Sequence, residues 1–215
     1  MKKITLNFLM LLLALVGFMS SCSQNEEVTP QAAGGRNENG GLKTTLANTY
    51  QVKRYIFQRP NGANGLGHVG VGFEVRIFNN GTLVSTTYYY GGVENSSASL
   101  NVPRNGNNGG WYRTSTSGAT MLNTMKNAPY NYVNYKFTAS FSSSTSSNIG
   151  NGINKISDFP YRGYFLAGNN CMNATYDVLT SMNLTGASVA WPSTNYAPNG
   201  WYNNTTNGWS ASTAL

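Results

Sequence analysis

Residues 67–75 (GHVGVGFEV) alternate strictly between apolar side chains and polar or small ones. Such alternation is typical of a β-strand with one face in a protein core. Asn79-Asn80-Gly81 follows the strand, and Asn-Gly is a preferred pair for a two-residue type I′ hairpin turn. A second strand is therefore expected over residues 83–90, antiparallel to the first, so the fold must contain this β-hairpin.

The rest of the chain from residue 49 predicts further strands and helices. We expect strands over residues 49–57 and 132–141, with a helix over residues 116–126. Residues 142–152 are rich in Ser, Asn and Gly, so we expect a loop there that passes into a short helix ending at Asp158. The predicted fold class is α+β, an antiparallel sheet with packed helices.

The segment around Cys171 predicts a cysteine at the first turn of a helix. Residues 164–167 (YFLA) are typical of a short buried strand that ends at Gly168-Asn169-Asn170. The inner face of the following helix is marked by apolar residues at helical spacing: Ala174, Val178 and Met182. At a helix start, free backbone N–H groups and the helix dipole favour a thiolate, so Cys171 is a candidate nucleophile. The alternative is a small buried hydrophobe.

His68 is the only histidine of the chain. It shares a strand face with Gly70 and Gly72, which leave room for another element to approach closely. We expect the helix that carries Cys171 to lie there, so that His68 and Cys171 form a pair. A structural histidine at a strand edge is the alternative.

Counting back from the Asn-Gly turn places His68 opposite Val93. Glu94 or Asn95 could then orient the imidazole if a bulge occurs at the nearby glycines. Glu74 shares the face of His68 but lies roughly 20 Å away along the strand, which excludes it as the orienting partner. A pair without a third member is equally compatible with the sequence.

Together these segments resemble the circularly permuted papain-like families, in which a histidine strand precedes the cysteine helix, and their unpermuted NlpC-type relatives. Residues 67–71 resemble the histidine strand, residues 164–171 resemble the stretch that opens the helix with Asn-Cys, and residues 90–94 resemble the Gly-rich turn of PPPDE-type peptidases. The resemblance implies a permuted papain-like fold, Cys171 as nucleophile and His68 as base. It also implies that backbone groups at Cys171, with Asn170, stabilise the oxyanion.

These families cut amides or esters, or transfer acyl groups. We expect a cysteine peptidase or amidase, with peptidoglycan peptide as the substrate, and we expect no cofactor and no metal. A non-catalytic binding module on the same fold is one alternative. Acyl transfer or thiol lipase activity is another, and it would need a long apolar groove.

The beginning of the sequence predicts an exported lipoprotein. A charged start and a short apolar run precede Met19-Ser20-Ser21-Cys22, which resembles the lipobox of bacterial lipoproteins. We expect residues 1–21 to be a signal peptide, Cys22 to carry lipid that binds a membrane, residues 22–48 to be a flexible tether, and residues 49–215 to form the domain. Glu26-Glu27 resembles an export tag, so we expect the cell envelope, at the outer membrane or surface of a Gram-negative bacterium.

Two further features bear on partners. The formal net charge is +7 at pH 7, but Lys and Arg form no cluster, so we expect no nucleic-acid partner. The aromatic stretch from Trp191 to Trp209 predicts a loop packed down by its own rings, with the wall of a substrate groove as the alternative.

Overall fold

The computed structural model of this chain describes residues 47–94, 101–104, 109–192 and 197–215. The expected signal peptide, the lipid site at Cys22 and nearly all of the expected tether lie outside these residues. Within the described ranges, no helix combines the length and the apolar character needed to cross a membrane.

Seven strands form one antiparallel sheet in the order β5-β3-β2-β1-β6-β9, and β7 also pairs with β1. Their bounds are β1 Thr49–Arg59, β2 His68–Asn79, β3 Thr82–Gly92, β5 Trp111–Ser115, β6 Asn134–Phe137, β7 Ser142–Ser144 and β9 Thr213–Ala214. A separate two-stranded sheet pairs β4 (Asn101–Val102) with β8 (Tyr164–Phe165).

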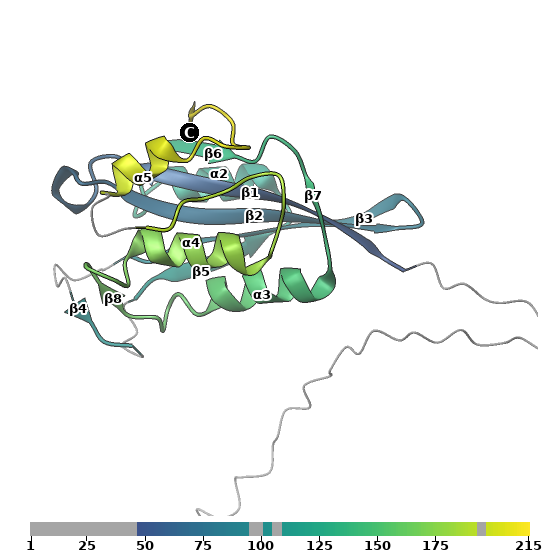
Figure 1. Cartoon of the computed structure of the whole chain (residues 1–215), viewed down its shortest axis with the longest axis horizontal. Coiled ribbons are helices and arrows are strands. Elements are labelled where there is room, and N and C mark those ends of the chain that lie inside the picture. The colour runs from purple at the N-terminus through teal and green to yellow at the C-terminus, as the bar shows by residue number, and fades with distance from the viewer. Residues whose placement is uncertain (1–46, 95–100, 105–108, 193–196) are drawn as a thin grey trace, which may run out of the picture. The chain divides into compact units, whose positions relative to one another are not determined.

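Helices cover both faces of the main sheet (Figure 1). The helices are α2 (Gly118–Lys126), α3 (Ser146–Ser157), α4 (Cys171–Ser181) and α5 (Pro198–Asn204), with a short 3-10 turn, η1 (Ala63–Gly65). Helices α3 and α4 lie side by side on one face and α2 lies on the other (Figure 1). The expected α+β class is confirmed, and the predicted helix over residues 116–126 is confirmed as α2.

Each face of the sheet has its own core. The valines of β2 pack with α3, α4 and the C-terminal aromatic residues in the larger cluster. The predicted inner face of α4 is confirmed, because Ala174, Val178 and Met182 are all buried there. The smaller cluster, on the α2 side, consists of Phe57, Tyr90, Met121, Met125 and Tyr132.

The predicted hairpin is confirmed, but its register differs from the expected one. Asn80 and Gly81 adopt φ of 52° and 79°, as a type I′ turn requires. Close to the turn, Phe78 pairs with Leu83 while Ile77 pairs with Ser85, so that one residue of β3, Val84, is bulged. Every later pair is shifted by one residue.

Two sequence predictions about local structure are wrong. Residues 142–152 do not form a loop, because β7 pairs with β1 and α3 begins at Ser146. The Thr145 hydroxyl caps α3 by accepting from the N–H of Asn148, and burial of Ile149 and Ile156 outweighs the low helix propensity of Ser, Asn and Gly.

Residues 164–167 are not a buried strand either, because β8 ends at Phe165, whose side chain is exposed.

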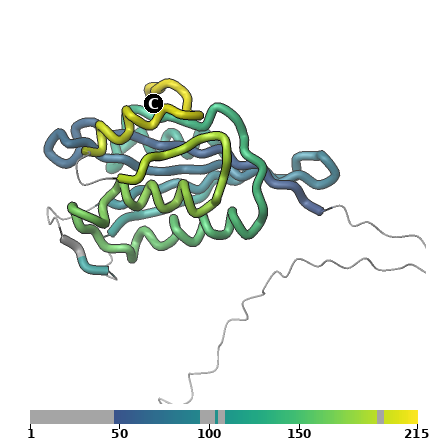
Figure 2. The backbone as a smooth tube through the Cα atoms, in the orientation of Figure 1, coloured from purple at the N-terminus to yellow at the C-terminus, as the bar shows by residue number. Residues whose placement is uncertain are grey.

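The segment after α4 returns across the sheet and brings α5 close to β2 and α4 (Figure 2).

Lys136 of β6 binds the C-terminal end of α5 through buried hydrogen bonds. Its Nζ atom is buried and donates to the carbonyls of Tyr202 at 2.8 Å and Thr205 at 2.9 Å, at the C-terminal end of α5. The Tyr202 carbonyl also accepts from the N–H of Thr205, but the Thr205 carbonyl has no other donor among the described residues. The cation therefore satisfies a carbonyl at the helix end that would otherwise be buried without a donor.

Part of the aromatic C-terminal stretch packs into the core, and part of it lines a cleft. Trp201, Tyr202 and Trp209 are buried and contribute to the larger core. Trp191, in contrast, is 62% exposed and lies at the wall of a cleft.

Candidate active site

Glu94 lies beside His68 where the ends of three neighbouring strands meet. Arg59 at the end of β1 pairs with His68 at the start of β2, and Glu94 follows the end of β3. The Nε2 atom of His68 lies 3.5 Å from Oε1 of Glu94, and Nη1 of Arg59 lies 3.9 Å from Oε2. The structure therefore brings together His68 and the predicted orienting residue Glu94.

The bulge at Val84 explains why Glu94, and not Val93, meets the imidazole. The register observed between Val71 and Gly91 continues to position 94 opposite His68, one residue beyond the expected partner. The predicted bulge exists, but it lies near the hairpin turn and not at the glycines. Asn95, the other candidate, lies outside the described residues.

Glu74 is excluded as an orienting partner, as its place in the sequence predicts. Its buried carboxylate accepts from Nε of Arg76 at 2.7 Å and from the hydroxyl of Tyr55 at 3.0 Å.

The glycines beside His68 make room for Tyr132, and not for the cysteine helix. A Cβ atom at Gly70 would lie 2.7 Å from the Tyr132 hydroxyl, and one at Gly92 would lie 2.6 Å from it. The helix α4 instead packs on the opposite, valine-bearing face of β2, so the expected approach over the glycines is wrong. The glycines do leave space beside His68, but Tyr132 fills it, and not the helix that carries Cys171.

Tyr132 is the residue of this candidate site that the sequence did not predict. It is completely buried, and its hydroxyl donates to Oε1 of Glu94 at 3.0 Å. Its ring also lies 5.8 Å from that of His68. Tyr132 therefore fixes the carboxylate that faces the imidazole.

Cys171 is the first residue of α4, as predicted, and Asn170 is its N-cap. The Oδ1 atom of Asn170 accepts from the N–H groups of Met172 at 2.9 Å and Asn173 at 3.2 Å, while Asn173 Oδ1 accepts from the N–H of Asn170. This reciprocal capping box fixes the helix start, and with it the position of the thiol. Nδ2 of Asn170 donates to the carbonyl of Leu166 at 2.8 Å, which leaves it one further N–H.

The backbone N–H of Cys171 finds no hydrogen-bond acceptor among the residues that the structure describes. It stands at the positive end of the helix dipole, where an oxyanion would be stabilised. The expected oxyanion role thus falls mainly on this backbone group, since Asn170 is engaged in capping.

Cys171 and His68 stabilise each other's charged forms. Burial would raise the pKa of the Cys171 thiol, but the charge and hydrogen bond of His68, with the N–H groups of Val69 and Met172, hold that pKa below its usual range. Burial would likewise lower the pKa of His68, but Cys171 and Glu94 raise it to about 9. Each group therefore favours the charged form of the other.

Glu94 is ionised near neutral pH. Burial would raise its pKa, but His68, Arg59 and the Tyr132 hydroxyl together lower it. Because Nε2 of His68 faces Glu94, it is Nδ1 that remains for Cys171. The order thiol, imidazole, carboxylate is that of a nucleophile, a base and an orienting group.

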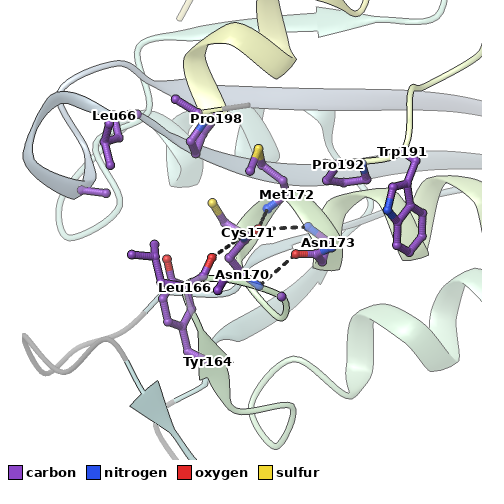
Figure 3. Close-up of a pocket in the computed structure, with 15 residues that line it drawn as sticks. Leu66, Tyr164, Leu166, Asn170, Cys171, Met172, Asn173, Trp191, Pro192 and Pro198 are labelled. Carbon is purple, nitrogen blue, oxygen red and sulfur yellow. Dashed lines mark hydrogen bonds between the residues drawn. The ribbon is translucent and has the colours of Figure 1, made fainter. Parts of the chain in front are cut away.

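A cleft of about 840 Å³ opens in front of Cys171. Figure 3 shows the thiol at the start of α4, with Leu66 and Pro198 on one side of it and Tyr164 and Leu166 on the other. Cys171 is therefore buried at the start of its helix, yet it borders a space large enough for a substrate.

No metal site accompanies this arrangement within the described residues, where no group of three or more His, Cys, Asp or Glu side chains could hold an ion. No family model matches the chain, and no curated protein or solved structure matches it significantly.

Proposed function

We propose that this domain is a cysteine hydrolase of the permuted papain-like type, which cleaves an amide or ester through an acyl-enzyme on Cys171. The observation that carries the proposal is the buried Cys171–His68 pair at a helix start, with Glu94 on the far nitrogen of the imidazole. The antiparallel sheet, with its histidine strand preceding the cysteine helix, agrees with that fold.

Each residue of the site has its own role in the proposed reaction. The thiolate of Cys171 attacks the substrate carbonyl carbon, and the backbone N–H of Cys171 stabilises the oxyanion. His68 then gives its proton to the leaving group, and in the second half it takes a proton from the water that hydrolyses the acyl-enzyme. Glu94, held by Tyr132, keeps the imidazole in the orientation and tautomer that both transfers need.

We further propose that the enzyme works in the cell envelope, attached to a membrane by lipid on Cys22. This part rests on the sequence of residues 1–22 alone. Peptidoglycan peptide would be within reach of such an enzyme, and so would membrane lipid. The chemistry at Cys171 is compatible with either substrate.

The pH dependence of Cys171 alkylation tests the proposed pair. In the full chain with Cys22→Ser, Cys171 is the only thiol, so iodoacetamide reports on it alone. We expect alkylation to reach its plateau well below the value of about 8.5 for a free thiol, and His68→Ala to move the onset to higher pH. Circular dichroism of both proteins checks that they are folded.

Two results would contradict the proposal. Alkylation that occurs only after unfolding would show that Cys171 is structural. An onset that is unchanged by His68→Ala would show that the two residues do not act together, and a non-catalytic binding module would then be the better description.

A further inference from the structure

We propose that the cleft in front of Cys171 binds a long apolar acyl chain, so that the substrate is a fatty acyl ester whose acyl group passes to the thiol. The inference deepens the proposed cysteine chemistry and rests on it. It concerns the carbonyl side of the bond that is broken, because that side remains attached to Cys171 in the acyl-enzyme.

The lining of the cleft is apolar and uncharged. Apart from Cys171 itself, none of the described residues that line it carries a charge, and most of the lining comes from apolar or small residues such as Leu66, Leu166, Met172, Trp191 and Pro198. The three internal segments outside the described residues, 95–100, 105–108 and 193–196, contain no charged residue in their sequence either. A peptidoglycan peptide carries carboxylates and amines that need charged or hydrogen-bonding partners, and this lining offers no charged ones.

The side-chain oxygens of the two asparagines in the lining are already engaged. The amide groups of Asn170 and Asn173 form the capping box of α4, and Asn170 also donates to Leu166. The side-chain groups left for a peptide backbone are the Tyr164 hydroxyl, the Trp191 indole N–H and the remaining asparagine amide N–H groups, whereas an alkyl chain needs no polar partner.

One wall of the cleft is held in place although its apolar side chain is exposed. Leu66 is 51% exposed, and its carbonyl accepts from the N–H of Asn199 at 3.2 Å. The side chain of Asn199 donates to the carbonyl of Pro60 at 3.0 Å and accepts from Nε2 of Gln58 at 2.9 Å. These bonds tie the segment before β2 to the start of α5, so this wall is shaped before any ligand binds.

Trp191 is a second apolar lining residue that is exposed in the same way. Trp191 packs edge-on against Tyr176, with 4.8 Å between the ring centroids, and still presents 62% of its surface to solvent. Two large apolar side chains, Leu66 and Trp191, therefore border the same cleft as the nucleophile. An alkyl chain would remove both from water.

The reaction balances with the groups present. The thiolate of Cys171 forms a C–S bond to the acyl carbon while the ester C–O bond breaks, and the alcohol leaves with the proton of His68. Water then attacks the thioester and gives its proton to His68 as the new C–O bond forms and the C–S bond breaks. The products are a fatty acid, an alcohol and the restored thiolate–imidazolium pair.

Hydrolysis of 4-nitrophenyl acetate, butyrate and octanoate by the full chain with Cys22→Ser tests the inference, with a Cys171→Ala protein as the blank. We expect kcat/KM to rise at least about tenfold from acetate to octanoate, because each buried methylene adds to binding in an apolar site. Leu66→Ala and Trp191→Ala should each lower the octanoate-to-acetate ratio by about threefold or more. Tyr161→Ala is the matched control, because Tyr161 is 53% exposed but does not line the cleft, and it should change neither rate.

The outcomes separate the inference from the function on which it rests. A Cys171-dependent rate that is independent of chain length overturns the acyl inference and leaves the cysteine hydrolase standing. A second outcome also overturns it. If the 7-amino-4-methylcoumarin amide of an N-acetylated apolar dipeptide is cleaved faster than 4-nitrophenyl octanoate, the substrate is a peptide. If no ester is hydrolysed and the alkylation onset of Cys171 is that of a free thiol, the proposed function itself fails.

Discussion

The hydroxyl of Tyr132 donates a hydrogen bond of 3.0 Å to Oε1 of Glu94, the same oxygen that lies 3.5 Å from Nε2 of His68. This bond crosses the space that Gly70 and Gly92 leave open. The proposed catalytic residues are therefore supported from both faces of the sheet, since α4 carries Cys171 on one face and Tyr132 reaches Glu94 from the other.

Tyr132→Phe should lower kcat for ester hydrolysis on the order of tenfold while KM changes little. The substitution removes only the hydroxyl, so Glu94 loses a donor and the imidazole is held less firmly, which affects proton transfer more than binding. Tyr90→Phe is the matched control, because Tyr90 is buried in the same cluster but its hydroxyl pairs with Thr124. Equal losses in the two variants would show a general effect on the core.

His68 should titrate in the folded protein with a pKa of about 9, measured by NMR from the ring protons of the only histidine. Glu94→Gln should lower this pKa, because it removes a negative charge that favours the imidazolium. Glu74→Gln removes a carboxylate that is bonded to Arg76 and should leave the titration unchanged. A histidine that titrates near its ordinary value of about 6.5 in the unsubstituted chain would contradict the ion pair.

The same pKa shift predicts how stability depends on pH. Because the pKa of His68 is raised by folding, its contribution to stability is fully present below its unfolded value of 6.5 and is lost as the pH rises through about 9. We expect His68→Ala to weaken the loss of stability across this range, measured by urea unfolding at several pH values. A decline of equal size in both proteins would assign it to other groups.

Two glycines of α3 should respond to alanine in opposite directions. A Cβ atom at Gly150 would meet nothing within 4 Å, so Gly150→Ala should stabilise the protein by about 0.5–1 kcal/mol through the better helix propensity of Ala. At Gly152 a Cβ atom would lie 2.6 Å from Cγ of buried Met182, so Gly152→Ala should destabilise by about 1–3 kcal/mol. Urea unfolding midpoints at equal m-value measure both. Changes of the same sign would show that α3 packs differently.

Lys136→Met should destabilise the protein by about 1–3 kcal/mol in the same measurement. The substitution keeps much of the side chain but removes the Nζ donor, which leaves the buried Thr205 carbonyl unpaired and the Tyr202 carbonyl with only its bond from the N–H of Thr205. Lys155→Met is the control, because Lys155 is exposed on α3 and its loss should cost less than about 0.5 kcal/mol. A small effect at Lys136 would show that other donors replace Nζ.

Local signals were enough to predict the hairpin and the cysteine helix. The alternation of β2, the Asn80-Gly81 turn and the helical spacing after Cys171 each depend on neighbours a few residues apart. The pairing of Glu94 with His68 was predicted only as one of several possibilities, because the position of a bulge is decided by contacts along the whole hairpin.

The features that the sequence did not predict depend on contacts between distant segments. The helix α3 is built largely from Ser, Asn and Gly, and it is held by Ile149 and Ile156, which pack in the shared core. The glycines of β2 indicated a close approach, but only the packing of the whole domain decides that Tyr132 fills the space.

The bulge at Val84 makes the length of the hairpin decide which residue of the chain lies opposite His68. Val84 lies next to the turn, and the site lies ten residues along the chain, or about 33 Å of extended strand. Deleting this one exposed residue would restore the unshifted ladder and present Val93 to His68 in place of Glu94. Insertions and deletions at the tip of a surface hairpin are usually harmless. Here the tip sets the register of the two strands, and this register places a carboxylate beside the imidazole.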